Sequence, residues 1–440
     1  MTKVEIKKLC KTHNVNSVSL WFTDVLGMLK SVSVSIKEID DVIENGKFFD
    51  GSSIEGFARI EESDLLLQPD LDTFLVLPFE IGDYKIGRLI CDVYKPNNTS
   101  FTNCPRGVLK RTLQKLSRPG YKMYCGPELE YFYLKENEDQ HDLIDRGKYF
   151  DMLGIDEGTV LREKTLSTLE SIGIKCECTH HEVAPSSHEI GLKYAEALKM
   201  ADQVMTYRFI VKAVAQQAGF HATFMPKPIT GINGSGMHVH QSLFKGAKNI
   251  FYDKQDEYGL SAIAKFYTAG LLKYSREITL TTNQWVNSYK RLVPGYEAPT
   301  YIAWGRANRS ALVRIPATRP GKAKATRVEY RAPDPACNPY LAFASMLGAG
   351  LQGIKEKLVL DKPAEDDIYH LSKEELDGRK IGVLPDNLIE AVQEAEESKF
   401  LQDLLGEGLH TKLLENKHQE WDEYRIQVSD YEKKRYLPIL

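Results

Sequence analysis

Alternating apolar and polar residues predict three strands that each carry reactive side chains on one face. Residues 237–241 read Met-His-Val-His-Gln, so the two histidines leave the strand on one side and the apolar residues on the other. Residues 125–133 and 326–331 alternate in the same way. A solvent-facing sheet gives this alternation in any one strand, but the three together predict one polar cleft lined by a sheet. The polar faces carry Glu128, Glu130, His238, His240, Arg327, Glu329 and Arg331.

The residues around this predicted cleft favour a ligand. Residues 231–236, Gly-Ile-Asn-Gly-Ser-Gly, precede the histidine strand, and glycines let the backbone turn tightly and approach a ligand closely. A lone histidine is more often a hydrogen-bonded core residue, whereas two imidazoles on one face favour a site. Carboxylates crowded into one cleft repel each other unless a cation lies among them. We therefore expect metal ions in the cleft.

The first hundred residues have the pattern of a small α+β unit. Residues 96–105, rich in turn-forming residues, predict a boundary after it, which divides the chain into domains 1–103 and 104–440. The elements expected in the first domain are a helix at 3–13, strands at 15–23 and 30–36, a helix at 37–45, and strands at 74–78 and 87–94.

The rest of the chain predicts a larger unit of helices and strands. Residues 279–325 are rich in Arg, Asn, Gly and Pro and predict a long irregular segment, which in a compact protein is usually functional. From residue 386 onward we expect charged amphipathic helices and an apolar end. The other elements expected are helices at 105–116, 158–172, 194–218, 260–277 and 339–358, and a strand at 174–179.

Composition limits the class of protein. The chain has 440 residues, more than one core usually supports, and its hydrophobic and charged fractions of 42% and 27% are those of a globular protein. A net charge of -4 argues against direct nucleic-acid binding. The longest mostly apolar run, residues 341–354, is too short to span a bilayer. Seven scattered cysteines predict free thiols in a reducing cytosol, and hence a cytoplasmic protein.

Three local patterns do not carry the chemistry that they suggest. Residues 348–353 match the glycine spacing of a dinucleotide site but lie inside a predicted helix, so close helix packing is the better interpretation. Residues 181–188 lack the spacing of a zinc protease, and Pro185 opposes a helix there. Gly321-Lys322 lacks the upstream glycine of a phosphate-binding loop. Any nucleotide must therefore be bound in another way.

An ordered set of motifs, spread over almost the whole chain, resembles type I glutamine synthetases of the shorter form, which is not adenylylated. Glu-x-Glu alone is a weak signal, whereas the complete set in this order is very specific. The motifs are Asp-Gly-Ser-Ser from Asp50, Gly-Pro-Glu-Leu-Glu ending at Glu130, His-His-Glu-Val-Ala-Pro from His180, Asn-Gly-Ser-Gly-Met-His from Asn233, Lys-Arg-Leu-Val-Pro-Gly-Tyr-Glu from Lys290, Asn-Arg-Ser from Asn308 and Arg-Ala-Pro-Asp-Pro from Arg331.

The resemblance implies a fold and a reaction. The fold would be α+β, with a small N-terminal β-grasp domain and a large catalytic domain like that of ATP–guanido kinases. In the large domain, a curved antiparallel sheet would form a half-barrel flanked by helices. The reaction would join ammonia to the γ-carboxylate of L-glutamate with ATP, by way of γ-glutamyl phosphate, and would release glutamine, ADP and phosphate. Such an enzyme must neutralise phosphate charge, deprotonate ammonium and keep water from the acyl phosphate.

The resemblance also implies two or more Mg²⁺ or Mn²⁺ ions in each subunit, which suit oxygen and imidazole ligands. One ion would be held by Glu130, Glu182 and Glu189. The other would be held by Glu128, His238 and Glu329. Arg291, Arg331, Asn233 and Gly234 match positions that bind glutamate, where a planar guanidinium suits a carboxylate. The positions that match ATP contacts are Glu177, His240, Ser242, Arg309, Arg314, Lys324 and Arg327.

The remaining matches concern ammonium and assembly. Asp50 matches the residue that takes the proton from ammonium, and Ser53 and Tyr149, with Glu182, belong to the same pocket. Glu297 lies on a loop that would close over the intermediate and exclude water. Because Asp50 belongs to the N-terminal domain, which in the family reaches a neighbouring subunit, we expect active sites shared within a dodecamer of two hexameric rings. The apolar C-terminal end fits the tail that joins the rings.

Regulation and two alternative functions stay open at this point. Arg59 matches a position that mediates glutamine feedback, and control by a PII-like protein is a further expectation of partnership. The neighbours of Tyr369 differ from the adenylylation motif, so we predict no adenylylation. The alternatives are a ligase that joins glutamate to another amine, such as a polyamine, and an inactive regulatory relative. The first would alter the ammonium pocket and the second would be free to lose metal ligands, and this sequence shows neither change.

Overall fold

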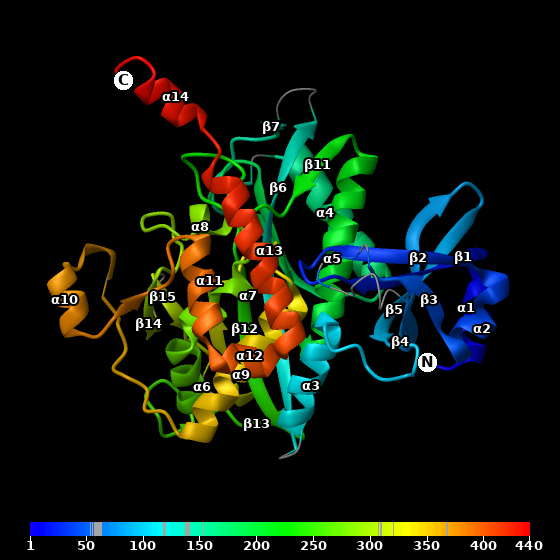
Figure 1. The fold of residues 1–440 in the computed structure, drawn as a ribbon, viewed down its shortest axis with the longest axis horizontal. Coiled ribbons are helices and arrows are strands. Elements are labelled where there is room, and N and C mark those ends of the chain that lie inside the picture. The colour runs from blue at the N-terminus through cyan, green and yellow to red at the C-terminus, as the bar shows by residue number, and fades with distance from the viewer. Residues whose placement is uncertain are drawn as a thin grey trace.

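The computed structural model places a small N-terminal unit beside a larger one, each with its own sheet (Figure 1). The residues that it describes are 1–52, 54, 56, 64–117, 120–136, 141–152, 154–306, 308, 310–319, 321–366 and 368–440. Among them no helix is both long enough and apolar enough to cross a membrane.

The small unit is built on a five-stranded sheet with the order β2-β1-β5-β4-β3. β1 and β5 run parallel, and the other neighbouring pairs run antiparallel. The apolar side chains of the sheet form one core with Ile6 and Cys10 of the first helix. Its elements are α1 (Lys3–Thr12), β1 (Val15–Thr23), β2 (Leu29–Ser35), α2 (Ile39–Asn45), β3 (Lys47–Asp50), β4 (Asp64–Ile81) and β5 (Tyr84–Tyr94).

The large unit is built on a twelve-stranded sheet with the main order β17-β14-β15-β16-β12-β6-β9-β8. No described pairing joins β17 to β8, so the sheet stays open, as expected of a half-barrel. Neighbouring strands are antiparallel apart from β14 and β15, which are parallel and correct the expectation of a purely antiparallel sheet. The strands are β6 (Tyr121–Glu136), β7 (His141–Leu143), β8 (Cys176–His181), β9 (Ser187–Leu192), β10 (Ala195–Glu196), β11 (Phe220–Thr223), β12 (Met237–Lys245), β13 (Lys248–Asn249), β14 (Tyr301–Gly305), β15 (Ala311–Arg314), β16 (Val328–Tyr330) and β17 (Gly382–Val383).

Among the helices of this unit, α9 is buried over most of its length and packs against α3, α5, α6, α7 and α12. The apolar face of the sheet and these helices form one large core. The helices are α3 (Pro105–Ser117), α4 (Glu157–Ser171), α5 (Ala197–Gln217), α6 (Ala262–Lys273), α7 (Ser275–Thr282), α8 (Ser288–Arg291), α9 (Pro339–Glu356), α10 (Lys373–Gly378), α11 (Leu388–Glu397), α12 (Lys399–Leu405), α13 (Glu407–Arg425) and α14 (Asp430–Tyr436).

The glycines of residues 348–353 serve helix packing, as we predicted from the sequence. They lie inside α9. A Cβ atom on Gly350 would come within 2.1 Å of the Tyr267 ring, and one on Gly353 within 2.2 Å of the Phe266 carbonyl oxygen. The absence of side chains at these positions therefore lets α6 approach α9 closely.

Several expectations about the elements differ from the structure, and two of these differences lie at the polar cleft. Residues 279–325 are not irregular throughout, because they contain β14 and β15 and the short helix α8. The strand expected at 174–179 instead runs to residue 181. Both differences concern the polar cleft, since β15 and the end of β8 carry side chains that face it.

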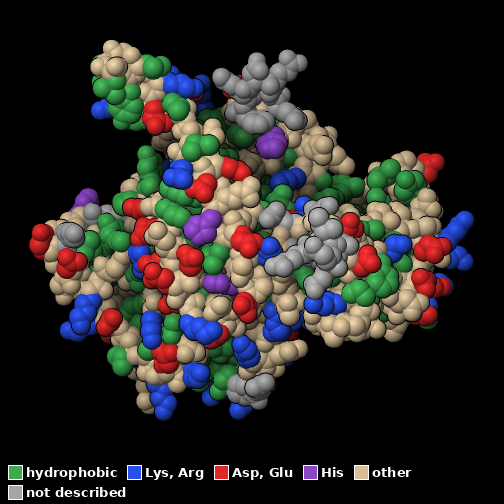
Figure 2. Space-filling model, viewed as in Figure 1, with side chains coloured by type: hydrophobic (Ala, Val, Ile, Leu, Met, Phe, Trp, Pro, Cys, Tyr) green, Lys and Arg blue, Asp and Glu red, His purple; other side chains and the backbone are tan. Residues whose placement is uncertain are grey.

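The C-terminal segment projects from the body of the molecule (Figure 1). It ends in α14 and four further residues, of which Leu437, Ile439 and Leu440 are largely exposed. Figure 2 shows hydrophobic side chains on this projecting part. Elsewhere on the same face acidic and basic side chains are interspersed, without one dominant basic patch.

Candidate active site

The register of the large sheet brings the polar side chains of its central strands into neighbouring rows. On β6, Glu128 pairs with His238 of β12, and Glu130 pairs with Glu189 of β9. Because side chains alternate along a strand, these four lie on one face of the sheet. The opposite face, which includes Leu129, is buried in the core. The alternation in the sequence therefore predicted the polar face of these strands correctly.

The strands on either side extend this polar face. His180, near the end of β8, pairs with Glu189. On the other side, Glu329 of β16 pairs with both His240 of β12 and Arg314 of β15. The result is a band of carboxylates and imidazoles, with guanidinium groups toward one side.

The acidic cavity, of about 230 Å³, opens over this band. We use this name for the cavity lined by Glu128, Glu130, Tyr149, Cys178, His180, Glu182, Val183, Ala184, Ser187, Glu189, Asn233, Gly234, His238, Arg291, Tyr296, Glu297, Ala298, Arg314 and Arg331. Twelve of the residues expected at the site from the sequence are among these. They come from stretches that are far apart along the chain, which the fold brings together.

One group in the cavity consists of Glu128, His238 and Glu329, whose potential ligand atoms lie within 4.8 Å of one another. Nδ1 of His238 is 3.6 Å from Oε2 of Glu128 and 3.6 Å from Oε1 of Glu329. Burial opposes ionisation of Glu128, but hydrogen bonds from His238 and His240 outweigh it and lower the pKa of this carboxyl. The group has the donor types of a site for a hard divalent ion.

A second group consists of His180, Glu182 and Glu189. The two nitrogens of His180 lie 3.3 Å from Oε1 of Glu182 and 3.5 Å from Oε1 of Glu189. Burial, reinforced by the charge of Glu130, raises the pKa of Glu182 to about 9. Burial, reinforced by the charge of Glu128, also raises the pKa of Glu189 well above its usual range.

Glu130 lies beside this second group. Its Oε2 accepts a hydrogen bond of 2.9 Å from the backbone N–H of Gly236, and burial raises the pKa of the carboxyl. Gly236 also leaves no room for a side chain, because a Cβ there would be 2.6 Å from Arg291 Nη2. The glycine turn predicted from the sequence thus positions a carboxylate. So many buried carboxylates in one cavity can ionise together only if a cation joins them.

Guanidinium groups line the side of the cavity opposite His180. Nε of Arg314 is 3.0 Å from Oε2 of Glu329, and Nε of Arg331 is 3.4 Å from Oε1 of the same residue. Arg291 is buried, and its Nη1 donates a hydrogen bond of 2.7 Å to the carbonyl oxygen of Ala332. One side of the cavity is therefore lined by carboxylates that could bind cations, and the other side by arginines that could bind anions.

A second cavity of about 460 Å³ adjoins the first and shares Glu128 and Cys178 with it. Nε2 of His240 is 2.8 Å from Oε1 of Glu128, and Nε of Arg327 donates to Nδ1 of His240 at 3.2 Å. This chain of contacts links the two cavities. The residues expected to bind nucleotide that line it are Glu177, His240, Ser242, Lys324 and Arg327.

Residues 293–297 form a turn at the rim of the acidic cavity. Gly295 and Glu297 both have positive φ, of 90° and 57°. The neighbouring Tyr296 is held at two points, since Asn233 Nδ2 donates to its carbonyl oxygen at 3.4 Å and the Lys227 ammonium lies 3.9 Å from its ring centroid. The rim is thus a tight turn with one charged side chain on the cavity.

Asp50 is separate from the two cavities in this single chain. It lies at the end of β3, on the edge of the small sheet, and its Oδ1 accepts hydrogen bonds of 2.8 and 2.7 Å from Ser52 N and Oγ. These bonds, the side-chain one foremost, lower the pKa of its carboxyl. Three other expected residues, Ser53, Arg59 and Arg309, lie outside the described residues.

Family models match both parts of the chain. The glutamine synthetase catalytic domain matches residues 102–436, and the glutamine synthetase beta-Grasp domain matches residues 14–96. The chain belongs to the glutamine synthetase family. Its small unit is accordingly the β-grasp domain of that family, and the fold class expected from the sequence is confirmed.

Full-length relatives of known sequence and structure support this family assignment. Glutamine synthetases of Thermotoga maritima and Methanosarcina mazei are each 47% identical to the chain, covering 99% and 100% of it and 100% and 98% of their own lengths. Among solved structures, a GmaS/ADP complex has a TM-score of 0.90 at 30% identity and covers 98% of this chain and 99% of its own. Plasmodium falciparum glutamine synthetase has a TM-score of 0.89 at 26% identity and covers 99% of both.

The position of His180 in the acidic cavity was not predicted from the sequence. We assigned the second metal group to Glu130, Glu182 and Glu189, whereas in the structure His180 lies among the last two and Glu130 lines the cavity beside them. The two adjacent histidines gave no signal for which one faces the cavity. The register of β8 decides it, because His180 pairs with Glu189 whereas His181, also in the strand, pairs with His188.

A buried network beneath the β8–β9 connection was also missed. Nη1 of Arg162 is 2.8 Å from Nδ1 of His188, and a guanidinium can only donate, so that nitrogen accepts and the ring proton is on Nε2, which lies 3.3 Å from Asp145. Burial lowers the pKa of His188 to about 4. Oδ1 of Asp145 lies 2.8 Å from Nε2 of His181, and it accepts a hydrogen bond of 2.8 Å from the backbone N–H of Ser186. The hydrogen bonds of Asp145 Oδ1 with His181 and Ser186 hold this connection, whereas Asp145 Oδ2 and His188 Nε2 have no hydrogen-bond partner among the described residues.

Proposed function

We propose that this protein is an ATP-dependent ligase that joins ammonia to the γ-carboxylate of L-glutamate and so makes glutamine. The observation that carries the proposal is the acidic cavity, in which two carboxylate–imidazole groups face three arginines in a chain of this family. A carboxylate resists attack by a nucleophile until it is phosphorylated, and phosphoryl transfer needs positive charge around the transferred group. The cavity offers both cation sites and guanidinium groups for that purpose.

Mg²⁺ or Mn²⁺, two or more ions in each subunit, fit the residues of the cavity. The raised pKa values of Glu182 and Glu189 reflect carboxyl groups that lack a counter-charge, which a bound cation would supply. We propose that one ion is held by Glu130, Glu182 and Glu189, with His180 beside them. The other would be held by Glu128, His238 and Glu329. Bound there, such ions would offset the charge of the transferred phosphoryl group.

The anionic substrates would be bound by the arginine side of the cavity. We propose that Arg291 and Arg331, with Asn233 and Gly234, hold the glutamate carboxylates and amino group. Arg314, together with Arg309, would bind the phosphate being transferred. The adjoining cavity would hold the nucleotide, with Glu177, His240, Ser242, Lys324 and Arg327 on its wall. One solved relative is an ADP complex, which agrees with a nucleotide site in this fold.

Ammonium must lose a proton before it can attack the acyl phosphate. We propose that Asp50 accepts this proton and that Ser53, Tyr149 and Glu182 complete the ammonium pocket. A carboxylate with a lowered pKa is ionised at neutral pH and attracts the cation. Glu297 would close the rim over γ-glutamyl phosphate, so that ammonia and not water reaches it.

A second copy of the chain would bring Asp50 to the cavity. Two exposed apolar surfaces support this proposal. Phe48, two residues before Asp50 on β3, is 56% exposed, and Phe150 and Met152, which follow Tyr149 at the cavity, are 62% and 72% exposed. We propose that these surfaces meet in a dodecamer of two hexameric rings, joined by the apolar C-terminal segment. Its mass in light scattering should equal that of about twelve chains.

Location and regulation follow from the same assignment. We propose a cytoplasmic enzyme that acts in nitrogen assimilation without contact to membrane or nucleic acid. Arg59 would mediate feedback by glutamine, and a PII-like protein would be a regulatory partner. Tyr369 would carry no nucleotide, so the intact mass of protein from cells grown in excess nitrogen should show no adduct there.

Phosphate release tests the proposed function. The assay contains ATP, Mg²⁺ and glutamate, and compares ammonium with a panel of alkylamines and polyamines as acceptors. We expect release that depends on ammonium, with glutamine as product, and a loss of at least 100-fold in Asp50→Ala because a general base is removed. Release with larger amines alone would instead assign the chain to glutamate–amine ligases. Bound ATP without release for any acceptor would indicate an inactive relative.

A further inference from the structure

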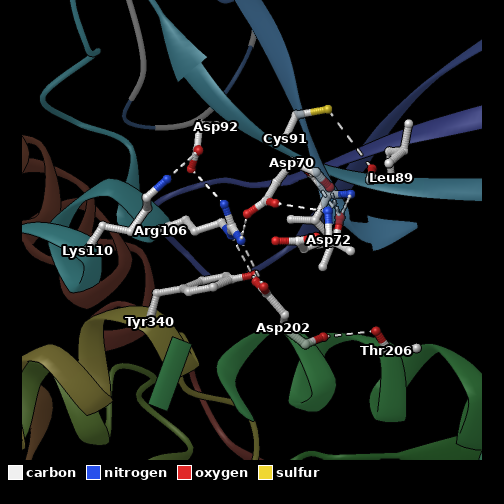
Figure 3. A network of polar contacts seen from close by, with 12 residues as sticks. Asp70, Asp72, Leu89, Cys91, Asp92, Arg106, Lys110, Asp202, Thr206 and Tyr340 are labelled. Atoms are coloured by element: carbon white, nitrogen blue, oxygen red, sulfur yellow. Dashed lines mark hydrogen bonds and ion pairs between the residues drawn. The ribbon is translucent and has the colours of Figure 1, made fainter. Parts of the chain in front are cut away.

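A buried arginine with contacts in both units helps to join the small unit to the large one (Figure 3). Arg106 lies in the first turn of α3 and is 3% exposed. It donates two hydrogen bonds to Asp202, from Nε at 3.0 Å and from Nη2 at 2.9 Å. It donates one more from Nη1 to Asp92 at 2.8 Å and one from Nη2 to Asp70 at 2.7 Å. Four of its five N–H groups thus bind three carboxylates.

These carboxylates come from both units. Asp70 is on β4 and Asp92 on β5, in the small sheet, whereas Asp202 is on α5 of the large unit. The hydroxyl of Tyr340, on α9, donates to Asp202 at 2.7 Å, which fixes that carboxylate from the other side. Arg106 therefore bridges two strands of the small sheet to the helical core of the large unit.

A guanidinium group in the first turn of a helix, as Arg106 is in α3, is unusual and implies a specific role. The N-terminal turn of a helix carries a partial positive charge, which disfavours a guanidinium there. Three carboxylates offset this cost, but they would repel one another if the guanidinium were absent. Because the guanidinium fork is planar and each carboxylate sits on a fixed edge of it, the contacts define an orientation as well as a distance. A flexible ammonium group would not define that orientation.

A second bridge holds a different part of the small sheet. Asn338 Nδ2, at the start of α9, donates to the carbonyl oxygens of Asp24 and Val25 at 3.0 and 3.2 Å, and Gln284 Nε2 donates to that of Leu26 at 2.6 Å. These contacts hold the turn between β1 and β2. If Arg106 were lost, the small sheet would stay attached at this turn, through the hydrogen bond from Arg88 to Thr206 and through the contact of Phe79 with Phe209. The part of β4 between Asp64 and Asp70, which pairs with β3, would lose its charged contact with the large unit.

We propose that Arg106 is a positioning residue for the ammonium step, because it sets the tilt of the sheet edge that carries Asp50. The same strand that binds Arg106 through Asp70 pairs with β3, where Asp64 lies opposite Asp50. The orientation fixed by Arg106 is thus transmitted along one strand to Asp50. The inference rests on the proposed function, in which Asp50 completes the cavity of a neighbouring copy.

A comparison of two acceptors tests this role in the full-length oligomer. Hydroxylamine is uncharged at neutral pH and needs no base before it attacks the acyl phosphate, whereas ammonium does. For Arg106→Gln we expect kcat/KM for ammonium to fall by about 10- to 100-fold, the effect of a small misplacement of a catalytic group, with a fall of less than about 3-fold for hydroxylamine. A merely structural role would lower both alike.

Two further variants make the test specific. Arg276 donates hydrogen bonds to Glu390 and Glu394 within the large unit, from Nη2 at 2.5 Å and from Nε at 2.8 Å. Arg276→Gln removes this guanidinium and should leave the ratio of ammonium activity to hydroxylamine activity unchanged. Asp70→Ala removes only the contact to β4 and should give a smaller loss that is again selective for ammonium. It replaces Arg106→Gln as the deciding variant if that protein does not fold.

Equal losses for both acceptors, or full ammonium activity in the deciding variant, would overturn the inference. A change in the ratio for Arg276→Gln equal to that of the deciding variant would do so as well. Failure of the unaltered protein to make glutamine is a different result, seen before any variant is compared, and it would overturn the proposed function itself.

Discussion

At the scale of one residue, Glu189 is a carboxylate whose proposed role as a metal ligand is unfavourable for the stability of the metal-free protein. It is buried on the central sheet, opposite Glu130 and His180, and the charges of Glu128 and Glu182 oppose its ionisation in addition to burial. Without a cation the ionised form is therefore costly. A carboxylate that only stabilised the fold would be expected beside a permanent cation, as Asp202 is beside Arg106.

We predict that Glu189→Gln stabilises the metal-free protein and abolishes activity. The amide resembles the protonated acid, so at pH 8 it removes the cost of an ionised group, while it binds Mg²⁺ poorly. The melting temperature in EDTA at pH 8 should rise by about 2–4 °C, and glutamine formation should fall by more than about 100-fold. Glu196→Gln, which alters an exposed carboxylate bound to Lys122, is the control and should change neither. A lower melting temperature for Glu189→Gln would contradict this account.

A second prediction concerns pH and follows from Glu182. Its pKa is raised to about 9 in the folded, metal-free protein, so between its unfolded value near 4.5 and about 9 the native state binds more protons than the unfolded state. Its contribution to stability is then complete below pH 4.5 and is lost as pH rises through 9. Mg²⁺ must displace these protons.

The increase in melting temperature caused by Mg²⁺ should therefore grow from pH 6 to pH 9. Proton release on addition of Mg²⁺ should be detectable with an indicator dye in weak buffer at pH 7. An increase that is the same at every pH in this range would show that the carboxyl groups are ionised before the metal binds.

Individual site residues were predictable to the extent that their positions depend on local periodicity. The shared face of Glu128 and Glu130 follows from the alternation along one strand and was read correctly. The place of His180 was not predictable, because it depends on how far β8 continues and on its register against β9. The roles of these residues as ligands stay predictions.

At the scale of elements, the turn of residues 293–297 is the part of the site that we propose to move. Gly295 has φ of 90°, a conformation that other residues adopt only with strain of about 1–2 kcal/mol, and nothing within 4 Å would touch an added Cβ. Gly295→Ala would thus strain the turn without a clash, and would weaken closure of Glu297 over the cavity.

We expect Gly295→Ala to let water reach γ-glutamyl phosphate. Phosphate release should then exceed glutamine formation, whereas the two should be equal in the unaltered protein. Gly173→Ala, at a loop glycine with φ of 80° and equally open surroundings, is the control for general strain and should keep the two rates equal. Equal rates in Gly295→Ala would indicate that this turn does not exclude water.

The elements themselves were predictable where they are long and periodic. The first strand, residues 15–23, and the helices α3, α4, α5 and α9 were expected close to their observed bounds, whereas the helix expected at 260–277 is divided into α6 and α7. β14 and β15 were missed because they are five and four residues long, and parallel strands of that length owe their existence to partners distant in sequence. β4 was expected only at residues 74–78, because its register shifts against β5 interrupt the alternation.

At the scale of the whole molecule, the account separates two parts of one active site. The cavity belongs to the large unit, and Asp50 belongs to the edge of the small sheet. Under the proposed function, one chain therefore does not hold a complete site. The sequence motifs suggested this arrangement only through the family resemblance, because no local pattern tells which copy a residue serves. The domain boundary at residue 103 likewise stays a prediction.

Mixing two inactive variants tests the shared site. Asp50→Ala and Glu189→Gln, co-expressed with different tags and purified as mixed oligomers, should regain about a quarter of the unaltered activity, since a quarter of the sites combine an intact Asp50 from one copy with an intact Glu189 from another. Each variant alone should be inactive. No activity in the mixed oligomers would mean that both residues act within one chain.

The central claim is that the acidic cavity converts the γ-carboxylate of glutamate into an acyl phosphate, which ammonia then attacks. The most direct measurement uses glutamate labelled with ¹⁸O in its γ-carboxylate, with ATP, Mg²⁺ and ammonium, and determines the label in the released phosphate by mass spectrometry. We predict that each phosphate carries one ¹⁸O atom and that glutamine forms in equal amount. Unlabelled phosphate would contradict the account, because its oxygen would then have come from water.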